Sequence, residues 1–275
     1  AAAEICRRHG IPSAGPARAD SGTHLVFLLD GIAIKLYAPP WPEDFRAERA
    51  ALAGIGGGPF PRIVHEGALE GWPYLVMTRI QGKPVREVWS ILPRSEKEAL
   101  LRDLGGLLRR LHEAAVPPSL RTDWSAFASE LESTLESRND PPSGEWRDWL
   151  MSRARSDPGP FEPVLLHADV TWDHVFVARD SLGIRLTGLI DFGDAMSGDP
   201  MYEFGAPLLY MCFGDPGLTW SLLTGYGLPR CRVVARRVLA YSLLHRFGRL
   251  GRWLEKAPAP DGAAFEEALF GFRLD

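Results

Sequence analysis

The feature that most constrains the fold of this chain is a change in hydrophobic pattern near residues 78–84. Before this point, short apolar segments alternate with turn residues, which is typical of β-strands. One helix is expected among them, because Pro42 opens the segment and three glycines follow Ile55. The predicted strands are 24–29, 32–37, 60–66 and 74–80.

After this point helices predominate. Leucines 100, 104, 107, 108 and 111 fall on one face of a predicted helix that starts near Ser95. Further helices are predicted at 123–137, 144–155, 200–212, 216–224, 230–254 and 262–271, with short strands at 164–166, 175–177 and 185–190. The order predicts an α+β chain of two lobes, a small β-rich lobe (residues 1–79) and a larger, mainly helical lobe (residues 80–275).

Composition excludes some classes of partner. The 275 residues carry 31 Lys plus Arg against 35 Asp plus Glu, a net charge of −4, whereas nucleic-acid binders need clustered positive charge. The three cysteines are widely spaced and no apolar stretch is long enough to cross a bilayer. We therefore expect a cytoplasmic protein, a monomer or homodimer, that binds neither nucleic acid nor membrane.

Two carboxylates beside predicted apolar strands are the candidates for catalysis or metal binding. Asp169 follows the strand at 164–166, Asp191 follows the strand at 185–190, and a predicted hairpin lies between them. Such a hairpin brings both carboxylates to one place. The pair suits a Mg²⁺ ion that also binds phosphate oxygens, or an acid/base pair for sugar chemistry, and spacing leaves both open.

The segments around these residues resemble a known family. His167-x-Asp169 with His174, then Asp191-Phe192-Gly193, is similar to the catalytic loop and metal-binding turn of the protein-kinase-like fold, in particular the aminoglycoside phosphotransferase family. Similar segments also occur, in the family's order, at 32–35, 45–52, 74–84, 104–112 and 197–203. The resemblance implies a bilobal protein-kinase-like fold and a small-molecule kinase that uses ATP or GTP with Mg²⁺.

The resemblance also implies roles for single residues. Lys35 would contact the α- and β-phosphates while Glu48 holds it, Asp169 would accept or orient the proton of the substrate hydroxyl, and Asp191 would bind Mg²⁺. Lys35 as a solvated strand-edge lysine, and Glu48 paired with a neighbouring arginine (Arg46 or Arg49), are the alternatives. The other expected nucleotide contacts are Ser21, Gly22 and Thr23 over the phosphates, and Met77, Thr78 and Ile80 beside the adenine.

Two histidines accompany these carboxylates. His167 is expected to brace the loop rather than to react. His174 stands where the family has an asparagine, and an imidazole is a softer ligand than Mg²⁺ prefers. Either His174 ligates metal, or Asp173 replaces it, or the site works with one metal or binds nucleotide without transfer.

The sequence identifies the residues of the acceptor site less clearly. Carboxylates that would hold a polycationic substrate are Asp194, Asp199, Glu203 and Asp215. Against them, residues 216–254 contain seven arginines and no acidic residue. These arginines form a solvated helix face, or one of them faces the acceptor and favours a neutral or anionic substrate. Trp172 either stacks on the acceptor or packs in the core.

We therefore expect transfer of the γ-phosphoryl group of ATP or GTP to a hydroxyl of a small molecule. An aminoglycoside-type or other antibiotic, as for a resistance kinase, is the leading hypothesis for the acceptor. A kinase of a cellular metabolite and a nucleotide-binding protein without transfer are the alternatives. A protein kinase is disfavoured, because the chain has no long activation segment after Asp191 and no Ala-Pro-Glu triplet.

Overall fold

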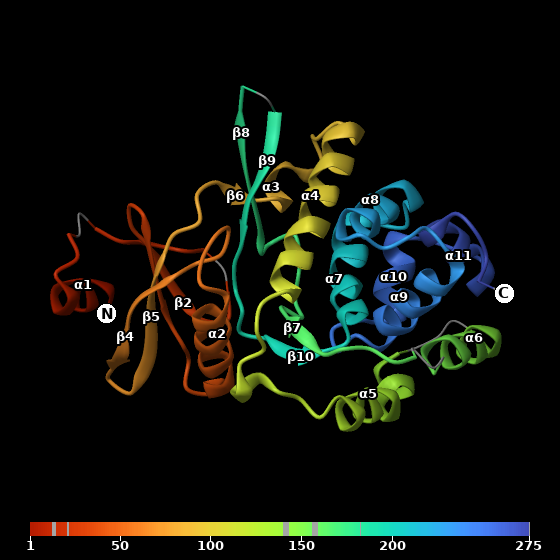
Figure 1. Ribbon diagram of the computed structural model, residues 1–275, viewed down its shortest axis with the longest axis horizontal. Coiled ribbons are helices and arrows are strands. Elements are labelled where there is room, and N and C mark those ends of the chain that lie inside the picture. Colours follow the sequence, from red (N-terminus) through yellow and green to blue (C-terminus); the bar gives the residue numbers. More distant parts are fainter. Residues whose placement is uncertain (13–14, 21, 140–142, 156–158, 182, 275) are drawn as a thin grey trace.

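The structure is a computed structural model that describes residues 1–12, 15–20, 22–139, 143–155, 159–181 and 183–274. A sheet-rich part with the N-terminus and a helical part with the C-terminus lie at opposite ends of the long axis (Figure 1). No helix in the described ranges is long and apolar enough to cross a membrane. The change in hydrophobic pattern near residues 78–84 thus corresponds to the passage from sheet to helices.

The sheet-rich part is built on five antiparallel strands in the order β1-β2-β3-β5-β4. Strand β5 has both faces buried, because Leu75 and Met77 pack on the side of α2 while Tyr74 and Val76 pack against α1. The sequence prediction omits α1, whose eight residues bury only three side chains. The elements are α1 (Ala2–His9), β1 (Ala17–Arg18), β2 (Leu25–Leu28), β3 (Ile32–Leu36), α2 (Pro42–Ile55), β4 (Ile63–Leu69) and β5 (Trp72–Thr78).

The helical part is organised around α4 (Arg94–His112) and α8 (Pro216–Tyr226), which lie side by side (Figure 1). All five leucines of the predicted helix face are buried on α4. The two helices approach closely at Gly105, where an added Cβ would lie 2.2 Å from the carbonyl oxygen of Leu222. The other helices are α3 (Arg86–Trp89), η1 (Pro118–Leu120), α5 (Trp124–Arg138), α6 (Gly144–Ala154), η2 (Pro200–Phe204), α7 (Gly205–Pro207), η3 (Leu208–Cys212), α9 (Arg232–Leu244), α10 (Leu250–Lys256) and α11 (Gly262–Phe270).

Short strands within the helical part carry the predicted reactive loops. A three-stranded antiparallel sheet has the order β6-β8-β9, and β10 pairs with β7. The hairpin of β8 and β9 separates the loop of Asp169 from the turn of Asp191, as the sequence predicts. These strands are β6 (Lys83–Pro84), β7 (Val164–Leu166), β8 (Val175–Asp180), β9 (Gly183–Leu189) and β10 (Met196–Gly198).

The helix predicted at 230–254 is wrong as a single element. It is divided into α9 and α10 by residues 245–249. His245 is buried and stacks on Tyr202 with ring centroids 4.6 Å apart, and the Arg246 N–H donates to the Tyr202 hydroxyl at 3.0 Å. This tertiary contact replaces the helical hydrogen bond and turns the chain back toward Asp194, whose carboxylate pairs with Arg246.

Candidate active site

Lys35 lies at the centre of the site. Its Nζ atom, on β3, lies 2.6 Å from Oε2 of Glu48 and 2.8 Å from Oδ1 of Asp191. Burial by itself lowers the pKa of Lys35, but the two carboxylates outweigh burial and raise this pKa well above its ordinary value. The lysine is therefore a buried, charged ammonium, and the alternative of a solvated strand-edge lysine is wrong.

Glu48 connects three parts of the site. Its Oε2 also accepts a hydrogen bond from the Tyr37 hydroxyl at 2.7 Å, and its Oε1 accepts one from the Phe192 N–H at 3.2 Å. The nearby arginines are engaged elsewhere, Arg46 with Glu43 and Arg49 with Glu66. The alternative pairing of Glu48 with these arginines is therefore wrong, and Glu48 joins α2 to β3 and to the turn that follows β9.

The loop of Asp169 is held by a buried carboxylate behind it. Ala168 has a φ of 65°, a left-handed conformation that glycine adopts more readily than alanine. The N–H groups of His167 and Ala168 each donate to a different oxygen of Glu203, both at 2.8 Å, and His112 Nε2 lies 3.1 Å from Oε2. Burial raises the pKa of Glu203. The hydrogen bond and charge of His112, together with the charge and backbone hydrogen bond of His167, outweigh burial and lower this pKa. This anchoring role of Glu203 is one that the sequence prediction missed.

His167 braces the loop from the other side. Its Nε2 donates to the carbonyl of Ile190 at 2.9 Å, and its Nδ1 accepts from the N–H of Asp169 at 3.2 Å. Burial lowers the pKa of His167 to about 4, so the imidazole is neutral at physiological pH. With both nitrogens bonded in this way, His167 braces the Asp169 loop, as expected from the sequence, and also connects it to the end of the strand before Asp191.

Asp169 and Asp191 have opposite electrostatic environments. Burial raises the pKa of Asp169 to about 6, and the carboxylates of Asp194 and Asp191 add to this, while His174 and Arg246 act in the opposite direction. Asp191 also lies in a partly desolvated place, but Lys35 and His174 lower its pKa well below the ordinary value. Asp169 therefore binds protons more readily, whereas Asp191 is a permanent anion.

His174 lies between the two carboxylates. Its Nδ1 lies 2.7 Å from the backbone carbonyl oxygen of Asp169 and donates to it, so in the neutral imidazole the Nε2 is the nitrogen with the lone pair. This Nε2 lies 3.7 Å from Oδ2 of Asp191. Asp173, the alternative ligand, instead forms an ion pair with Arg86 at 2.8 Å. Of the two candidates for the family's asparagine position, His174 is thus the one beside Asp191.

The protein by itself offers too few ligands for a divalent cation, so a cation bound here would also need water and phosphate oxygens. Among the described residues, no group of three or more His, Cys, Asp or Glu side chains gathers to hold a metal ion. One carboxylate oxygen of Asp191 and the Nε2 of His174 form a partial set of ligands. Such a set suits a cation that keeps water and binds mainly to phosphate oxygens.

The expected nucleotide residues line one cavity of about 900 Å³ between the sheet and the helical part. The same cavity is lined by Lys35, Asp169, His174 and Asp191. Thr78 is less available than predicted, since its N–H and its hydroxyl both bond to the backbone of Arg62. Ser21 lies outside the described residues. The other lining residues from the prediction are Gly22, Thr23, Glu48, Met77 and Ile80.

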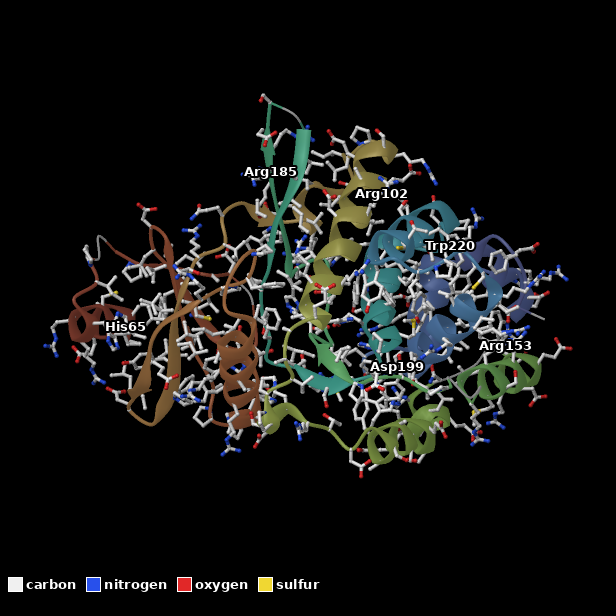
Figure 2. The ribbon with its side chains drawn as sticks, viewed as in Figure 1. His65, Arg102, Arg153, Arg185, Asp199 and Trp220 are labelled. Carbon is white, nitrogen blue, oxygen red and sulfur yellow. The ribbon has the colours of Figure 1, made fainter. Side chains whose placement is uncertain are left out.

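The carboxylates expected to bind a cationic acceptor are engaged elsewhere. Asp199 is fully buried among the helices (Figure 2), where it caps η2 and pairs with Arg237 at 2.9 Å. Asp215 caps α8 and pairs with Arg94. With Glu203 holding the Asp169 loop, three of the four predictions for the acceptor are wrong, because backbone N–H groups and arginines already use these oxygens.

Trp172 packs against aromatic rings of the helical part. Its ring centroid lies 5.6 Å from that of Phe213 and 6.2 Å from that of Tyr210. Of these rings, only that of Tyr210 is among the residues lining the cavity. The packing interpretation of Trp172 therefore agrees with the geometry better than stacking on an acceptor does.

A charged lysine that pairs with a helix glutamate and with Asp191, in a cavity that Asp169 also lines, is the site of a small-molecule kinase of the protein-kinase-like fold. The chain belongs to the phosphotransferase enzyme family, which it matches over residues 25–234. This membership bears out the resemblance drawn from the sequence.

Individual relatives agree with this assignment. An aminoglycoside 3'-phosphotransferase of Streptomyces ribosidificus is 30% identical over 191 residues, which are 63% of this chain and 70% of that protein. A homoserine kinase of Sinorhizobium fredii is 29% identical over 217 residues, 69% of this chain and 58% of that protein. The GDP complex of aminoglycoside 2'-phosphotransferase-IIIa has a similar fold, with a TM-score of 0.72 at 21% identity over 88% of this chain and 87% of that chain. This likeness confirms the two-lobed α+β fold.

Proposed function

We propose that this protein transfers the γ-phosphoryl group of ATP or GTP to a hydroxyl group of a small molecule, with an antibiotic as the leading acceptor. The observation that carries the proposal is the buried Lys35 ammonium, held by Glu48 and Asp191 in the cavity that Asp169 also lines. Phosphoryl transfer needs positioning and charge neutralisation more than covalent chemistry, and this arrangement supplies both.

The nucleotide would bind between the proposed lobes, residues 1–79 and 80–275. Lys35 would contact the α- and β-phosphates, and Glu48 would hold its ammonium in place. Gly22 and Thr23 would cover the phosphates, with Ser21 beside them, while the segment from Met77 to Ile80 would lie along the base. Mg²⁺, held by Asp191 and His174, would neutralise charge on the β- and γ-phosphates.

Asp169 would receive the proton of the acceptor hydroxyl. A pKa of about 6 leaves its carboxylate ionised near neutral pH yet more basic than an ordinary aspartate. Asp191, by contrast, is tied to Lys35 and holds no proton to donate, which disfavours an acid/base pair for sugar cleavage.

The antibiotic acceptor is supported by the likeness to an aminoglycoside 3'-phosphotransferase. A second candidate, a kinase of a cellular metabolite, is favoured by the likeness to homoserine kinase. It is also favoured because carboxylates that could have held a cationic acceptor are engaged elsewhere, Asp199 with Arg237 and Asp215 with Arg94. In either case the partner would be a small molecule, and the protein would act as a monomer or homodimer without nucleic acid or membrane. Its three unpaired cysteines suit the proposed location in the cytoplasm.

The experiment is to measure nucleotide binding and phosphoryl transfer separately. Calorimetric titration of ADP and GDP with Mg²⁺ tests the cavity, and γ-labelled ATP and GTP with a panel of aminoglycosides, other antibiotics and hydroxylated metabolites tests transfer. Asp169→Ala is the control, expected to retain nucleotide binding and to lose transfer. Absence of nucleotide binding would overturn the proposal, and binding without transfer to any acceptor would favour the nucleotide-binding alternative.

A further inference from the structure

The part of the cavity lining that we name the acceptor end consists of residues to which no nucleotide contact is assigned. Tyr210, Phe247 and Arg252 line it together with Asp169 and Asp173. Tyr210 lies beside Trp172 of the Asp169 loop, and Phe247 follows Arg246, which pairs with Asp194 just beyond the Asp191 turn. These contacts place the three residues at the acceptor side.

The local fold orients Arg252 toward this end. On α10, Leu250 and Trp253 are buried in the core at 1% and 2% exposure. Positions three apart on a helix share a face, so Arg252 projects from the opposite side, where it is exposed. Its Nη1 lies 3.4 Å from the Tyr210 hydroxyl, which keeps the guanidinium at the cavity mouth.

The carboxylates of the Asp169 loop and of the segment after the Asp191 turn already have cationic partners. Asp194 pairs with Arg246 at 2.7 Å, and Asp173 pairs with Arg86 at 2.8 Å. For Arg252, by contrast, no ion pair with a carboxylate occurs within the ranges that the structure describes. Apart from the reactive Asp169 and Asp191, the acceptor end thus offers paired carboxylates and one arginine that is not neutralised.

Two aromatic side chains complete the surface. Phe247 is 40% exposed, and the guanidinium of Arg246 lies 5.0 Å from its ring centroid. Phe247 and Tyr210 both line the cavity, and their rings provide apolar surface that a flat part of a ligand can cover. The site therefore combines an apolar surface with the planar guanidinium of Arg252, which can donate two parallel hydrogen bonds to an oxyanion.

We propose that Arg252 is a specificity-determining residue that binds an oxyanion, a carboxylate or phosphate, on the acceptor, while Phe247 and Tyr210 contact its apolar part. The inference deepens the proposed function and rests on it. It predicts that polycationic aminoglycosides are poor acceptors, because like charge at Arg252 repels them and the nearby carboxylates are paired.

The test uses four ligands that share a hydroxymethyl-substituted benzene ring and differ in the charge and identity of the group opposite the hydroxymethyl, together with one polycation. They are 4-(hydroxymethyl)benzoate, its amide, 4-(hydroxymethyl)benzylamine and 4-(hydroxymethyl)phenyl phosphate, with kanamycin as the polycation. Each is titrated by calorimetry into the protein saturated with ADP and Mg²⁺. An anionic ligand is expected to bind about tenfold more tightly than the amine, as a charge-assisted hydrogen bond provides.

Variants assign this preference to one residue. Arg252→Glu is expected to invert the order of carboxylate and amine, and Arg252→Lys to retain it more weakly. Arg102→Ala, which removes an exposed arginine of α4 away from the cavity lining (Figure 2), is expected to change nothing. The relative strength of carboxylate and phosphate binding distinguishes the two oxyanions.

Several results would overturn the inference. They are a preference for the amine or kanamycin, binding of none of the ligands, or an order that Arg252→Glu leaves unchanged. Measurement of ADP binding in the same samples distinguishes a failure of the role of Arg252 from a failure of the proposed function. Retained ADP binding without charge preference removes only the role of Arg252, whereas loss of ADP binding in the unmodified protein removes the proposed function as well.

Discussion

Replacement of Asp169 by asparagine should stabilise the fold. The pKa of this carboxyl is raised from an ordinary 3.8 to about 6, mainly by burial. The folded protein therefore disfavours the ionised form, which the unfolded chain accepts freely. A difference of about two pH units corresponds to about 3 kcal/mol at pH 8, where the group is ionised in both states. Asparagine has the same shape and carries no charge, so it removes this destabilisation.

The effect has a defined pH dependence. As the pH falls below 6, the folded protein binds a proton that the unfolded chain does not yet bind, and the destabilisation by Asp169 declines. The advantage of Asp169→Asn should therefore decrease from about 3 kcal/mol at pH 8 to about 1.5 kcal/mol at pH 5, and should approach zero near pH 3.

Guanidinium unfolding of both proteins at pH 5 and pH 8 measures this difference. Asp173→Asn is the matched control in the same loop, because it removes only an exposed ion pair with Arg86 and should lower stability by less than about 1 kcal/mol. A variant at position 169 that is no more stable than the natural protein at pH 8, or whose gain is equal at both pH values, would refute the reasoning. The same variant should lose phosphoryl transfer, since stability and activity conflict at this carboxylate.

Three further predictions concern helix packing, the anchoring of the Asp169 loop and metal preference. Gly105→Ala should lower stability by at least about 2 kcal/mol, because its Cβ would lie 2.2 Å from the Leu222 carbonyl oxygen. Gly106→Ala, whose Cβ would have its nearest contact at 3.8 Å, should instead raise stability by about 0.5 kcal/mol. Thermal unfolding compares the two variants, and equal effects would contradict the packing of α4 on α8. Glu203→Gln should cost about 3 kcal/mol in chemical denaturation, because two backbone N–H groups and a histidine lose their anionic acceptor, and an unchanged midpoint would exclude this anchoring role. His174→Asn should shift the preference of ADP binding from Mn²⁺ toward Mg²⁺ in calorimetric titrations, because an imidazole is the softer ligand; an unchanged ratio would show that this side chain does not ligate metal.

The sequence by itself determined the order of the fold and the position of its reactive loops. Strand and helix patterns depend on spacing within a short segment, so they are visible without the rest of the molecule. The hairpin between Asp169 and Asp191 is of this kind, because two strands joined by a tight turn return the chain to its starting point. The helix carrying Glu48 was likewise marked by its own proline and glycines.

Only the tertiary structure decided which charged groups are free to act. Glu203 and Asp199 were both suggested as acceptor carboxylates, yet each is buried and bonded to residues more than thirty positions away, His167 for Glu203 and Arg237 for Asp199. The break between α9 and α10 also depends on a distant partner, Tyr202, and it sets the position of Arg252 at the cavity. A sequence pattern shows a charge but not its partner, because partners in a folded core come from remote segments. For this reason the local pattern located the proposed reactive carboxylates, Asp169 and Asp191, while the packing decides which charged groups are already paired.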